Sequence, residues 1–219
     1  MEDASAASTD GDGAEPLRLF RKIPSERLEL YLMRGFLEPD ECAALIHLID
    51  RGSRRSTIYS VEQRPLFRTS DSCDFDLLHP LVAEVDRRIA RATGIAPEYG
   101  EVLQGQRYRP GQEFKAHCDF FATNAPYWEK ELQEGGQRTW SALIFLNTPD
   151  KGGHTLFPKA RLRITPVAGN LLFWNNLQKS GAGNPYSLHA GCPVAAGSKY
   201  VITKWFRERP RHSATATPR

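Results

Sequence analysis

Two segments in the first half of the chain show the apolar spacing of amphipathic helices. The first, residues 39–52, opens with a proline and two acidic residues and closes on a glycine, which are helix start and stop signals. It follows a short strand-like run at residues 30–33. The second predicted helix lies within residues 77–95 and ends at Gly94, and its apolar positions recur at helical spacing: Leu81, Val85, Ile89 and Ala92.

After residue 99 the chain changes from helical to strand-like patterning. Short runs rich in β-branched and aromatic residues are separated about every ten residues by Gly, Pro, Asn or Asp, which is typical of sandwiches and barrels. Two helices followed by about eight strands predict an α+β protein whose β part is a jelly roll. The predicted strands lie within residues 101–110, 114–121, 138–147, 154–158, 162–169, 170–176, 186–194 and 199–208.

Length and composition predict one domain. A chain of 219 residues that is 40% hydrophobic can bury one core well and is short for two domains. No run approaches the roughly 18 uncharged apolar residues that a membrane span needs. We expect residues 17–208 to form the domain, the small, polar and acidic residues 1–16 to be disordered, and residues 209–219 to be a flexible tail.

Charge is unevenly distributed along the sequence. The formal net charge is +3, but residues 1–16 hold five acidic residues, so the remainder has 29 basic against 21 acidic residues, a net charge of +8. Arginine clusters in the helical part could attract an acidic partner or nucleic acid, or they could be solvated helix faces. The second interpretation is favoured, because no basic run reaches the length of a nucleic-acid patch.

The start of the chain and the cysteines both favour the cytoplasm. Residues 1–16 lack the basic start and the apolar core of a signal peptide. The cysteines lie far apart without a CxxC pair, and four free thiols are expected when no secretory signal is present. They are Cys42, Cys73, Cys118 and Cys192.

A candidate metal site begins with two residues that lie two positions apart, His117 and Asp119. If residues 114–121 form a strand, both side chains project from one face and Cys118 projects from the other. His189, in a distant strand-like run, is the natural third ligand, and two histidines with one carboxylate leave three positions of an octahedral iron open. By itself the His-x-Asp pair also fits a zinc site or a hydrogen-bonded pair in an ordinary core.

Several separated segments together resemble the prolyl 4-hydroxylase family of 2-oxoglutarate oxygenases. The family pattern is a tyrosine, then His-x-Asp, a Gly-Gly-x-Thr segment, and a distal histidine followed ten residues later by a lysine. An Arg-Thr-Ser segment ahead of the barrel and the run after the distal histidine are also similar, so the resemblance covers residues 30–208. The matching residues are Tyr108, His117, Asp119, Gly152, Gly153, Thr155, His189 and Lys199.

The resemblance implies a fold and a reaction. The fold would be a double-stranded β-helix, a jelly roll of two facing sheets, with the N-terminal helices packed on one sheet. Iron(II) would be held by His117, Asp119 and His189, 2-oxoglutarate and dioxygen would be consumed, and ascorbate is a candidate reductant. Succinate and carbon dioxide would be released, and a substrate carbon would gain a hydroxyl group.

The resemblance also implies which residues bind the cosubstrate. Lys199 would pair with the distal carboxylate of 2-oxoglutarate, and Tyr108 and Thr155 would form hydrogen bonds to it. Strand alternation places Lys199 on the same face as Trp205, which would line the cavity or simply belong to the core. A lysine on an inward face needs a buried anion, which a dicarboxylate supplies, whereas an edge lysine would extend into solvent.

The substrate is the part that the sequence specifies least. The resemblance implies a prolyl residue in a peptide or protein, with Arg68 and Arg138 as candidate substrate residues. Arg68 could equally brace its loop, and Arg138 could equally be a solvent-exposed arginine at the start of a strand. Phe114 stands where many family members have a tyrosine. The alternatives are the same chemistry on a nucleic acid or a small molecule, and a barrel that binds a 2-oxo acid without catalysis. Nucleic acid is disfavoured, because no cluster of aromatic residues with interleaved arginines is present.

Overall fold

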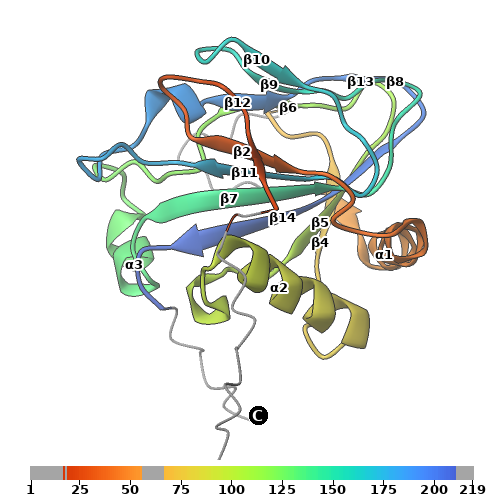
Figure 1. The fold of residues 1–219 in the computed structure, drawn as a ribbon, viewed down its shortest axis with the longest axis horizontal. Coiled ribbons are helices and arrows are strands. Elements are labelled where there is room, and N and C mark those ends of the chain that lie inside the picture. The colour runs from red at the N-terminus through yellow and green to blue at the C-terminus, as the bar shows by residue number, and fades with distance from the viewer. Residues whose placement is uncertain (1–16, 18, 56–66, 211–219) are drawn as a thin grey trace, which may run out of the picture.

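The structure is a computed structural model and describes residue 17, residues 19–55 and residues 67–210. The segment expected to be disordered, residues 1–16, lies outside the described residues, as does most of the predicted C-terminal tail. Three layers make up the described part: a smaller sheet, a larger sheet, and the helices that cover the far side of the larger sheet (Figure 1).

The two long helices form where the sequence predicts them. α1 (Pro39–Gly52) begins with a hydrogen bond from the Glu38 backbone N–H to the Glu41 carboxylate at 2.9 Å. α2 (Pro80–Thr93) ends at Gly94, whose φ of 71° is the left-handed conformation that glycine adopts without strain. No helix among the described residues is long and apolar enough to cross a membrane. Shorter helical segments were not predicted: η1 (Pro97–Tyr99), α3 (Trp128–Gln133) and η2 (Pro185–Ser187).

The strands form antiparallel sheets, and each of the eight predicted strand segments contains a strand of the structure. The eight-stranded sheet has the order β1 (Arg21–Lys22), β2 (Leu30–Met33), β11 (Leu171–Asn175), β7 (Arg138–Phe145), β14 (Lys199–Arg207), β5 (Gln104–Tyr108), β4 (Asp71–Asp74) and β3 (Arg54–Arg55). The four-stranded sheet has the order β10 (Leu162–Ile164), β9 (Thr155–Phe157), β12 (His189–Gly191) and β6 (Phe114–His117). A short ladder joins β13 (Val194–Ala196) and β8 (Lys151–Gly152).

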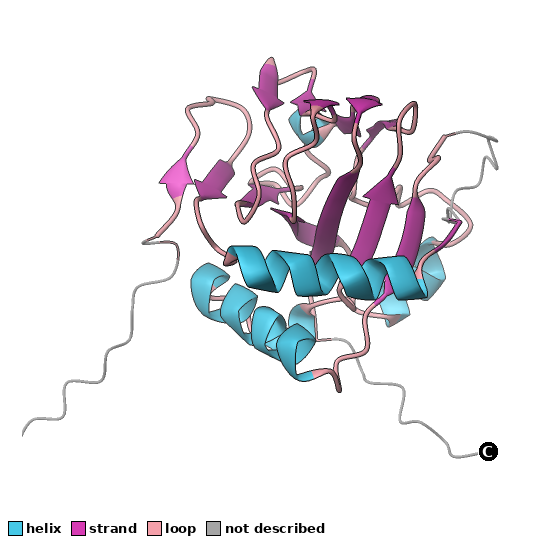
Figure 2. Cartoon of the chain, turned by 90° about the vertical axis from the view of Figure 1, so that its right-hand side faces the viewer, coloured by secondary structure: helices cyan, strands magenta, loops and turns pink. Residues whose placement is uncertain are grey.

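The larger sheet separates two hydrophobic cores. Along β7, Ala142 and Ile144 face the core beneath the helices, whereas Leu143 and Phe145 face the core between the two sheets. This alternation is the period-two pattern of a strand that is buried on both faces. Figure 2 shows α1 and α2 lying side by side across one face of the strands. The predicted arrangement, with N-terminal helices packed on one sheet of a jelly roll, is therefore confirmed.

Candidate active site

Two neighbouring strands of the smaller sheet bring two histidines together. His189, the first residue of β12, is the register partner of His117, the last residue of β6, and their ring centroids lie 4.3 Å apart. Asp119 approaches both: its Oδ1 lies 3.6 Å from His117 Nε2 and its Oδ2 lies 3.7 Å from His189 Nε2. Ligand atoms of the three residues all lie within 4.8 Å of one another.

One detail of the predicted geometry is wrong. The expected strand 114–121 ends at His117, so Asp119 lies in the irregular segment that follows and not on a continuous strand face. The carboxylate reaches the histidines because the chain bends after β6. Cys118 does not line the cavity, as expected.

The backbone fixes which ring nitrogen of each histidine faces the other ligands. Nδ1 of His117 lies 2.8 Å from the carbonyl oxygen of Lys115, and Nδ1 of His189 lies 2.9 Å from the carbonyl oxygen of Ser187. Because a carbonyl oxygen only accepts, Nδ1 carries the hydrogen in both rings. Each Nε2 therefore presents a lone pair toward Asp119, which is the tautomer that a metal ligand requires.

Asp119 is held by two buried residues that were not predicted. The hydroxyl of Ser141, on β7, donates to Asp119 Oδ2 at 2.6 Å, and the amide Nδ2 of Asn176 donates to Ser141 Oγ at 2.8 Å. A serine has one hydroxyl hydrogen, so its use on the carboxylate requires the amide N–H of Asn176 to face Ser141. Both side chains are completely buried. The relay fixes Oδ2, the carboxylate oxygen beside His189, and leaves Oδ1 directed toward His117.

Protonation states at neutral pH suit a cation. Burial, together with the neighbouring His189, lowers the pKa of His117 to about 3. Burial alone would raise the pKa of Asp119, but the fields of His189 and His117 outweigh it and leave that pKa below its ordinary value. His117 is therefore neutral and Asp119 is ionised, and such groups can bind a divalent metal without first losing a proton.

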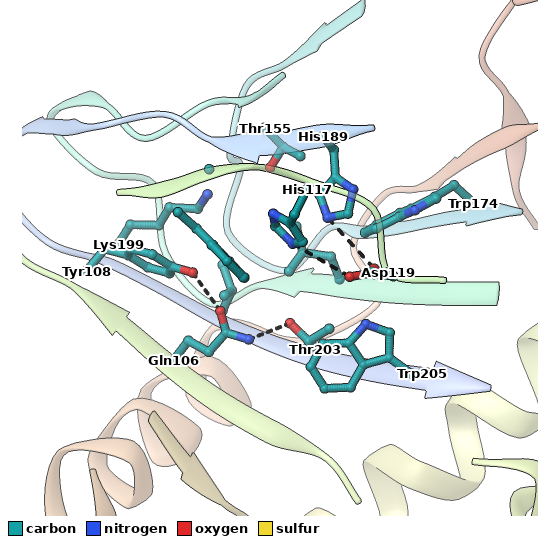
Figure 3. A pocket seen from close by; sticks show the side chains of 14 residues that line it. Gln106, Tyr108, His117, Asp119, Thr155, Trp174, His189, Lys199, Thr203 and Trp205 are labelled. Atoms are coloured by element: carbon teal, nitrogen blue, oxygen red, sulfur yellow. Dashed lines mark hydrogen bonds and ion pairs between the residues drawn. The ribbon is translucent and has the colours of Figure 1, made fainter. Parts of the chain in front are cut away.

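The candidate ligands open into a cavity between the two sheets, with about 430 Å³ of space between the atoms, part of it at the mouth. Figure 3 shows the side chains that line it. Seven residues predicted to bind the metal or the cosubstrate lie together here, and Phe114 lines the same cavity. The seven are Tyr108, His117, Asp119, Thr155, His189, Lys199 and Trp205. Arg68 and Arg138 are not among the lining residues.

Lys199 lies away from the three candidate ligands, on the wall that carries Tyr108 (Figure 3). It is 3% exposed and is the register partner of Tyr108 across β14 and β5. Its Nζ lies 5.6 Å from the ring centroids of Tyr108 and Phe145 and forms no ion pair or hydrogen bond with the described residues. Burial consequently lowers its pKa to about 8. The hydroxyl of Thr155 is also buried without a partner among the described residues. These groups suit a bound dicarboxylate.

A polar chain that was not predicted runs along the same wall. The hydroxyl of Tyr108 donates to Gln106 Oε1 at 2.7 Å, and Gln106 Nε2 donates to Thr203 Oγ1 at 2.9 Å. Gln106 and Thr203 are both about 95% buried, and both line the cavity. The chain continues to Gln104, whose Oε1 accepts from Arg68 Nη2 at 2.8 Å. Arg68 therefore adjoins the cavity through Gln104 instead of lining it.

Arg138 is engaged within the protein. It forms two hydrogen bonds of 2.7 Å to the carboxylate of Glu101, and its guanidinium lies 4.1 Å from the centroid of the Trp205 ring. Its side chain is 20% exposed, so the solvent-exposed alternative is wrong. The residue braces the wall that carries Trp205, and its role toward a substrate stays a prediction.

Phe114, on β6, covers one metal-ligand candidate. Its ring stacks on His117 with centroids 3.6 Å apart and planes 20° from parallel. The guanidinium of Arg68 lies 5.1 Å from the Phe114 ring centroid, and Phe67 packs edge-on against the same ring. An aromatic surface with one adjacent cation thus lies beside the candidate ligands.

Two of the residues that sequence reasoning missed share one signal. Ser141 is a polar residue within the buried run of β7, and Asn176 directly follows the buried strand β11, whereas Gln106 lies on a strand with other polar residues and has no such signal. A buried polar side chain needs a partner, so an isolated one within an apolar run is a candidate for a site. Which residue is its hydrogen-bond partner depends on how the strands pair, and that cannot be predicted from the local sequence.

A jelly roll with three convergent candidate metal ligands defines a class of metal-dependent proteins, and comparison with known proteins identifies the family within it. Residues 103–207 match the family model described as 2OG-Fe(II) oxygenase superfamily. "Probable prolyl 4-hydroxylase 8" of Arabidopsis thaliana is 31% identical over 222 residues, which cover 90% of this chain and 73% of the relative. "Prolyl 4-hydroxylase 1" of the same organism is 30% identical over 233 residues, which cover 95% and 80%.

The chain therefore belongs to the prolyl 4-hydroxylase family of the 2OG-Fe(II) oxygenase superfamily. It is a 2-oxoglutarate-dependent dioxygenase that uses iron(II), 2-oxoglutarate and dioxygen. The predicted family, enzyme class and cofactors are confirmed, apart from ascorbate, which stays a prediction.

Solved structures support the fold. A viral collagen prolyl hydroxylase from Paramecium Bursaria Chlorella virus-1, solved with 2-oxoglutarate, aligns with a TM-score of 0.64 at 24% identity, over 81% of this chain and 94% of its own. A prolyl hydroxylase from Trichoplax adhaerens, in complex with a hypoxia inducible factor peptide fragment, aligns with a TM-score of 0.59 at 18% identity, over 82% and 83%. Both share the jelly roll with this chain.

Proposed function

We propose that His117, Asp119 and His189 hold iron(II) and that Lys199, Tyr108 and Thr155 bind 2-oxoglutarate, so that this chain hydroxylates a prolyl residue of a peptide or protein at carbon 4. One observation carries the proposal: a buried lysine without a carboxylate partner among the described residues shares one cavity with three convergent ligand side chains. The geometry provides separate places for a metal and for the far carboxylate of a dicarboxylic acid.

The protein's own residues prepare the site. The bound iron supplies the activation of dioxygen that is coupled to decarboxylation of 2-oxoglutarate. Lys199 neutralises the distal carboxylate, and Tyr108 orients it. The relay from Asn176 through Ser141 keeps Asp119 ionised and correctly turned. The apolar core around the cavity excludes water from the reacting atoms.

A peptide substrate is supported by the family and by the surface beside the ligands. Phe114 and Phe67 offer flat apolar faces next to His117, and these faces can pack against a pyrrolidine ring. Arg68 adjoins that surface and can donate to a backbone carbonyl. On the helices, Arg87, Arg88 and Arg91 form ion pairs with glutamates, which favours solvated helix faces over a nucleic-acid surface.

The deciding experiment supplies iron(II), 2-oxoglutarate and dioxygen together with proline-containing peptides. We expect the peptide to gain the mass of one oxygen atom, one succinate to form for each hydroxylation, and amino-acid analysis to yield 4-hydroxyproline. The control is His189→Ala, which should bind no iron, produce no succinate, and keep the circular dichroism spectrum of the wild type. Full iron occupancy in that variant would contradict the ligand assignment.

Other outcomes point to the alternatives. Succinate production that only an oligonucleotide or a small molecule stimulates would assign the same chemistry to another substrate. No consumption of 2-oxoglutarate with any of these substrates would favour a barrel that binds the acid without catalysis. Hydroxylation at carbon 3 would keep the substrate class and contradict the proposed position.

We also infer that the chain acts in the cytoplasm. All four cysteines are free in the structure, and Cys42, Cys73 and Cys118 have a pKa raised chiefly by burial, as expected for structural thiols of a reducing compartment. Thiol titration of protein purified from its native source and denatured without reductant should count four thiols. A count of two would indicate a disulfide and an oxidising compartment.

A further inference from the structure

The side-chain amide of Gln106 lies between two hydroxyl groups. Its Oε1 accepts from the hydroxyl of Tyr108, and its Nε2 donates to the hydroxyl of Thr203. A hydroxyl can donate or accept, so the same site satisfies the amide after a rotation of about 180°. In the turned orientation Nε2 donates to Tyr108 and Oε1 accepts from Thr203. The amide oxygen and nitrogen are nearly equal in size, so both orientations fit the same buried space.

The two orientations differ in what they leave to a bound acid. Tyr108 has one hydroxyl hydrogen, and in this structure Gln106 uses it. A carboxylate only accepts hydrogen bonds, so Tyr108 in that state would present lone pairs to lone pairs. In the turned orientation Tyr108 receives a hydrogen bond from Gln106, and its own hydrogen is available to the acid. Cosubstrate binding therefore favours the turned amide.

We propose that Gln106 is a positioning residue for 2-oxoglutarate, whose side-chain amide turns over when the acid binds and directs the hydroxyl hydrogen of Tyr108 onto it. The inference rests on the proposed role of Tyr108 at the cosubstrate. The rotation gives up one long contact, from Gln106 Nε2 to Oε1 of Gln104 at 3.4 Å. The Tyr108 hydroxyl that exchanges partners also contacts Ser70 and Arg68. The two short bonds are exchanged for two bonds of the same kind, so the rotation costs little.

The test measures how much the Tyr108 hydroxyl contributes to 2-oxoglutarate affinity in three backgrounds. 2-Oxoglutarate is titrated calorimetrically into the Mn(II)-loaded protein, where Mn(II) replaces iron(II), and Tyr108→Phe is compared with its parent each time. The parents are the wild type, Gln106→Met, which removes donor and acceptor, and Gln106→Glu, which keeps an acceptor and loses the N–H donor. Because the contribution is a ratio within each background, the added charge of glutamate cancels.

A turning amide gives a distinctive pattern. Tyr108→Phe should weaken binding about tenfold or more in the wild type and in Gln106→Met, since the hydrogen reaches the acid in both. It should change binding less than twofold in Gln106→Glu, because the glutamate holds the hydrogen and cannot turn. If Gln106→Glu does not fold, equal losses in the wild type and Gln106→Met exclude a fixed acceptor. A lower 2-oxoglutarate affinity of Gln106→Met than of the wild type then supports the rotation, and equal affinities mean that Gln106 does not position the hydroxyl.

The contrary results are equally specific. A loss in Gln106→Met but none in the wild type would mean that Gln106 is a fixed acceptor, which overturns the proposal. A loss in all three backgrounds would mean that the hydroxyl acts independently of Gln106, which also overturns it. If Tyr108→Phe has no effect in any background although the acid binds, the role of Tyr108 fails while the metal and Lys199 assignments stand. A wild type that binds no 2-oxoglutarate would contradict the proposed function itself.

Discussion

Each face of β14 carries one buried lysine, and the two lysines differ in whether a carboxylate pairs with them. Lys204 points toward the helices, is 3% exposed, and forms a hydrogen-bonded ion pair with Asp86 of α2. Lys199 points toward the cavity, is also 3% exposed, and meets no carboxylate among the described residues. One strand thus holds one lysine that the fold neutralises and one lysine that the fold leaves without a carboxylate partner among the described residues.

The same difference extends to the regions on either side of the sheet. On the helix side the unpartnered buried atoms are the Ser53 hydroxyl and the Nε atoms of Arg88 and Arg107, whose other nitrogens form ion pairs. On the cavity side, whole polar groups are buried without a hydrogen-bond partner among the described residues. They belong to Thr155, Trp174 and Trp205. Folded proteins seldom leave such groups unpaired, because each costs free energy. Polar groups that lack any partner, together with Lys199, therefore mark the cavity side as the one that binds a ligand.

The largest effect that tests this comparison is on stability. Lys204→Ala leaves Asp86 buried and unpaired, so it should lower the free energy of unfolding by roughly 3–5 kcal/mol. Denaturant unfolding followed by circular dichroism measures the loss, and the folded fraction should bind 2-oxoglutarate as the wild type does. In the matched control, Lys204→Met with Asp86→Leu, most of the stability should return. A single variant as stable as the wild type would contradict the pairing.

The reciprocal substitution should affect ligand binding and spare stability. Lys199→Ala removes the partner of the distal carboxylate, and loss of one side of a buried ion pair corresponds to roughly a hundredfold or more in affinity. The Michaelis constant for 2-oxoglutarate should rise by that factor, with metal binding retained. Unfolding free energy should stay equal or rise, because the empty protein loses an unpaired buried charge. If both lysine variants raised the Michaelis constant equally, the assignment of the two faces would be wrong.

A smaller effect is expected for a polar group on the cavity side that is already paired. Ser141→Ala removes the hydroxyl that holds Asp119, and loss of such a supporting contact typically weakens metal affinity tenfold to a hundredfold. Mn(II) titration followed by electron paramagnetic resonance measures the change. Cys118→Ser is the control beside the ligands, and it should keep wild-type affinity. Equal losses in both variants would indicate general damage to the bend after β6.

The smallest expected effect is a pH dependence specific to Lys199. Its pKa of about 8 in the empty cavity lies below the ordinary value, so the lysine loses its proton as pH rises through 8. The acid binds the protonated form, and its affinity should fall by up to about tenfold for each pH unit above 8. In the same range the stability of the empty protein should rise, because the unfolded chain binds more protons than the folded one. Calorimetry from pH 7 to 10 checks the first trend, and Lys199→Arg should show a flat profile.

Much of this architecture could be predicted from the sequence because it depends on local patterns. The helix limits follow from Pro39 and Gly94, and alternation along residues 199–207 places Lys199 and Lys204 on opposite faces. The residue with which Lys204 pairs cannot be predicted from local patterns. Asp86 lies 118 positions before Lys204 in the sequence, so its pairing depends on where α2 packs on the sheet.

The three candidate ligands that the structure brings together could be singled out from the sequence, but the residues that support them could not. His117, Asp119 and Lys199 follow a spacing that identifies them, whereas the relay through Ser141 forms because β7 lies opposite the bend after β6. The bend itself was missed, because nothing in the run after His117 interrupts its strand-like composition. Contacts that depend on the register between distant strands cannot be predicted from local sequence patterns.

The position of β6 links the proposed metal site to the segment that carries Arg68. β6 is the outer strand of the smaller sheet, and among the described residues its outer side meets the segment that carries Arg68, through a bridge between Arg68 and Phe114. A metal bound by His117 and His189 would act as a cross-link between this edge and β12, and edge strands fray readily without one. Loss of the metal would then loosen the edge together with the Arg68 segment. Metal binding and the folding of the Arg68 segment would thus be coupled, so a change in one would change the other.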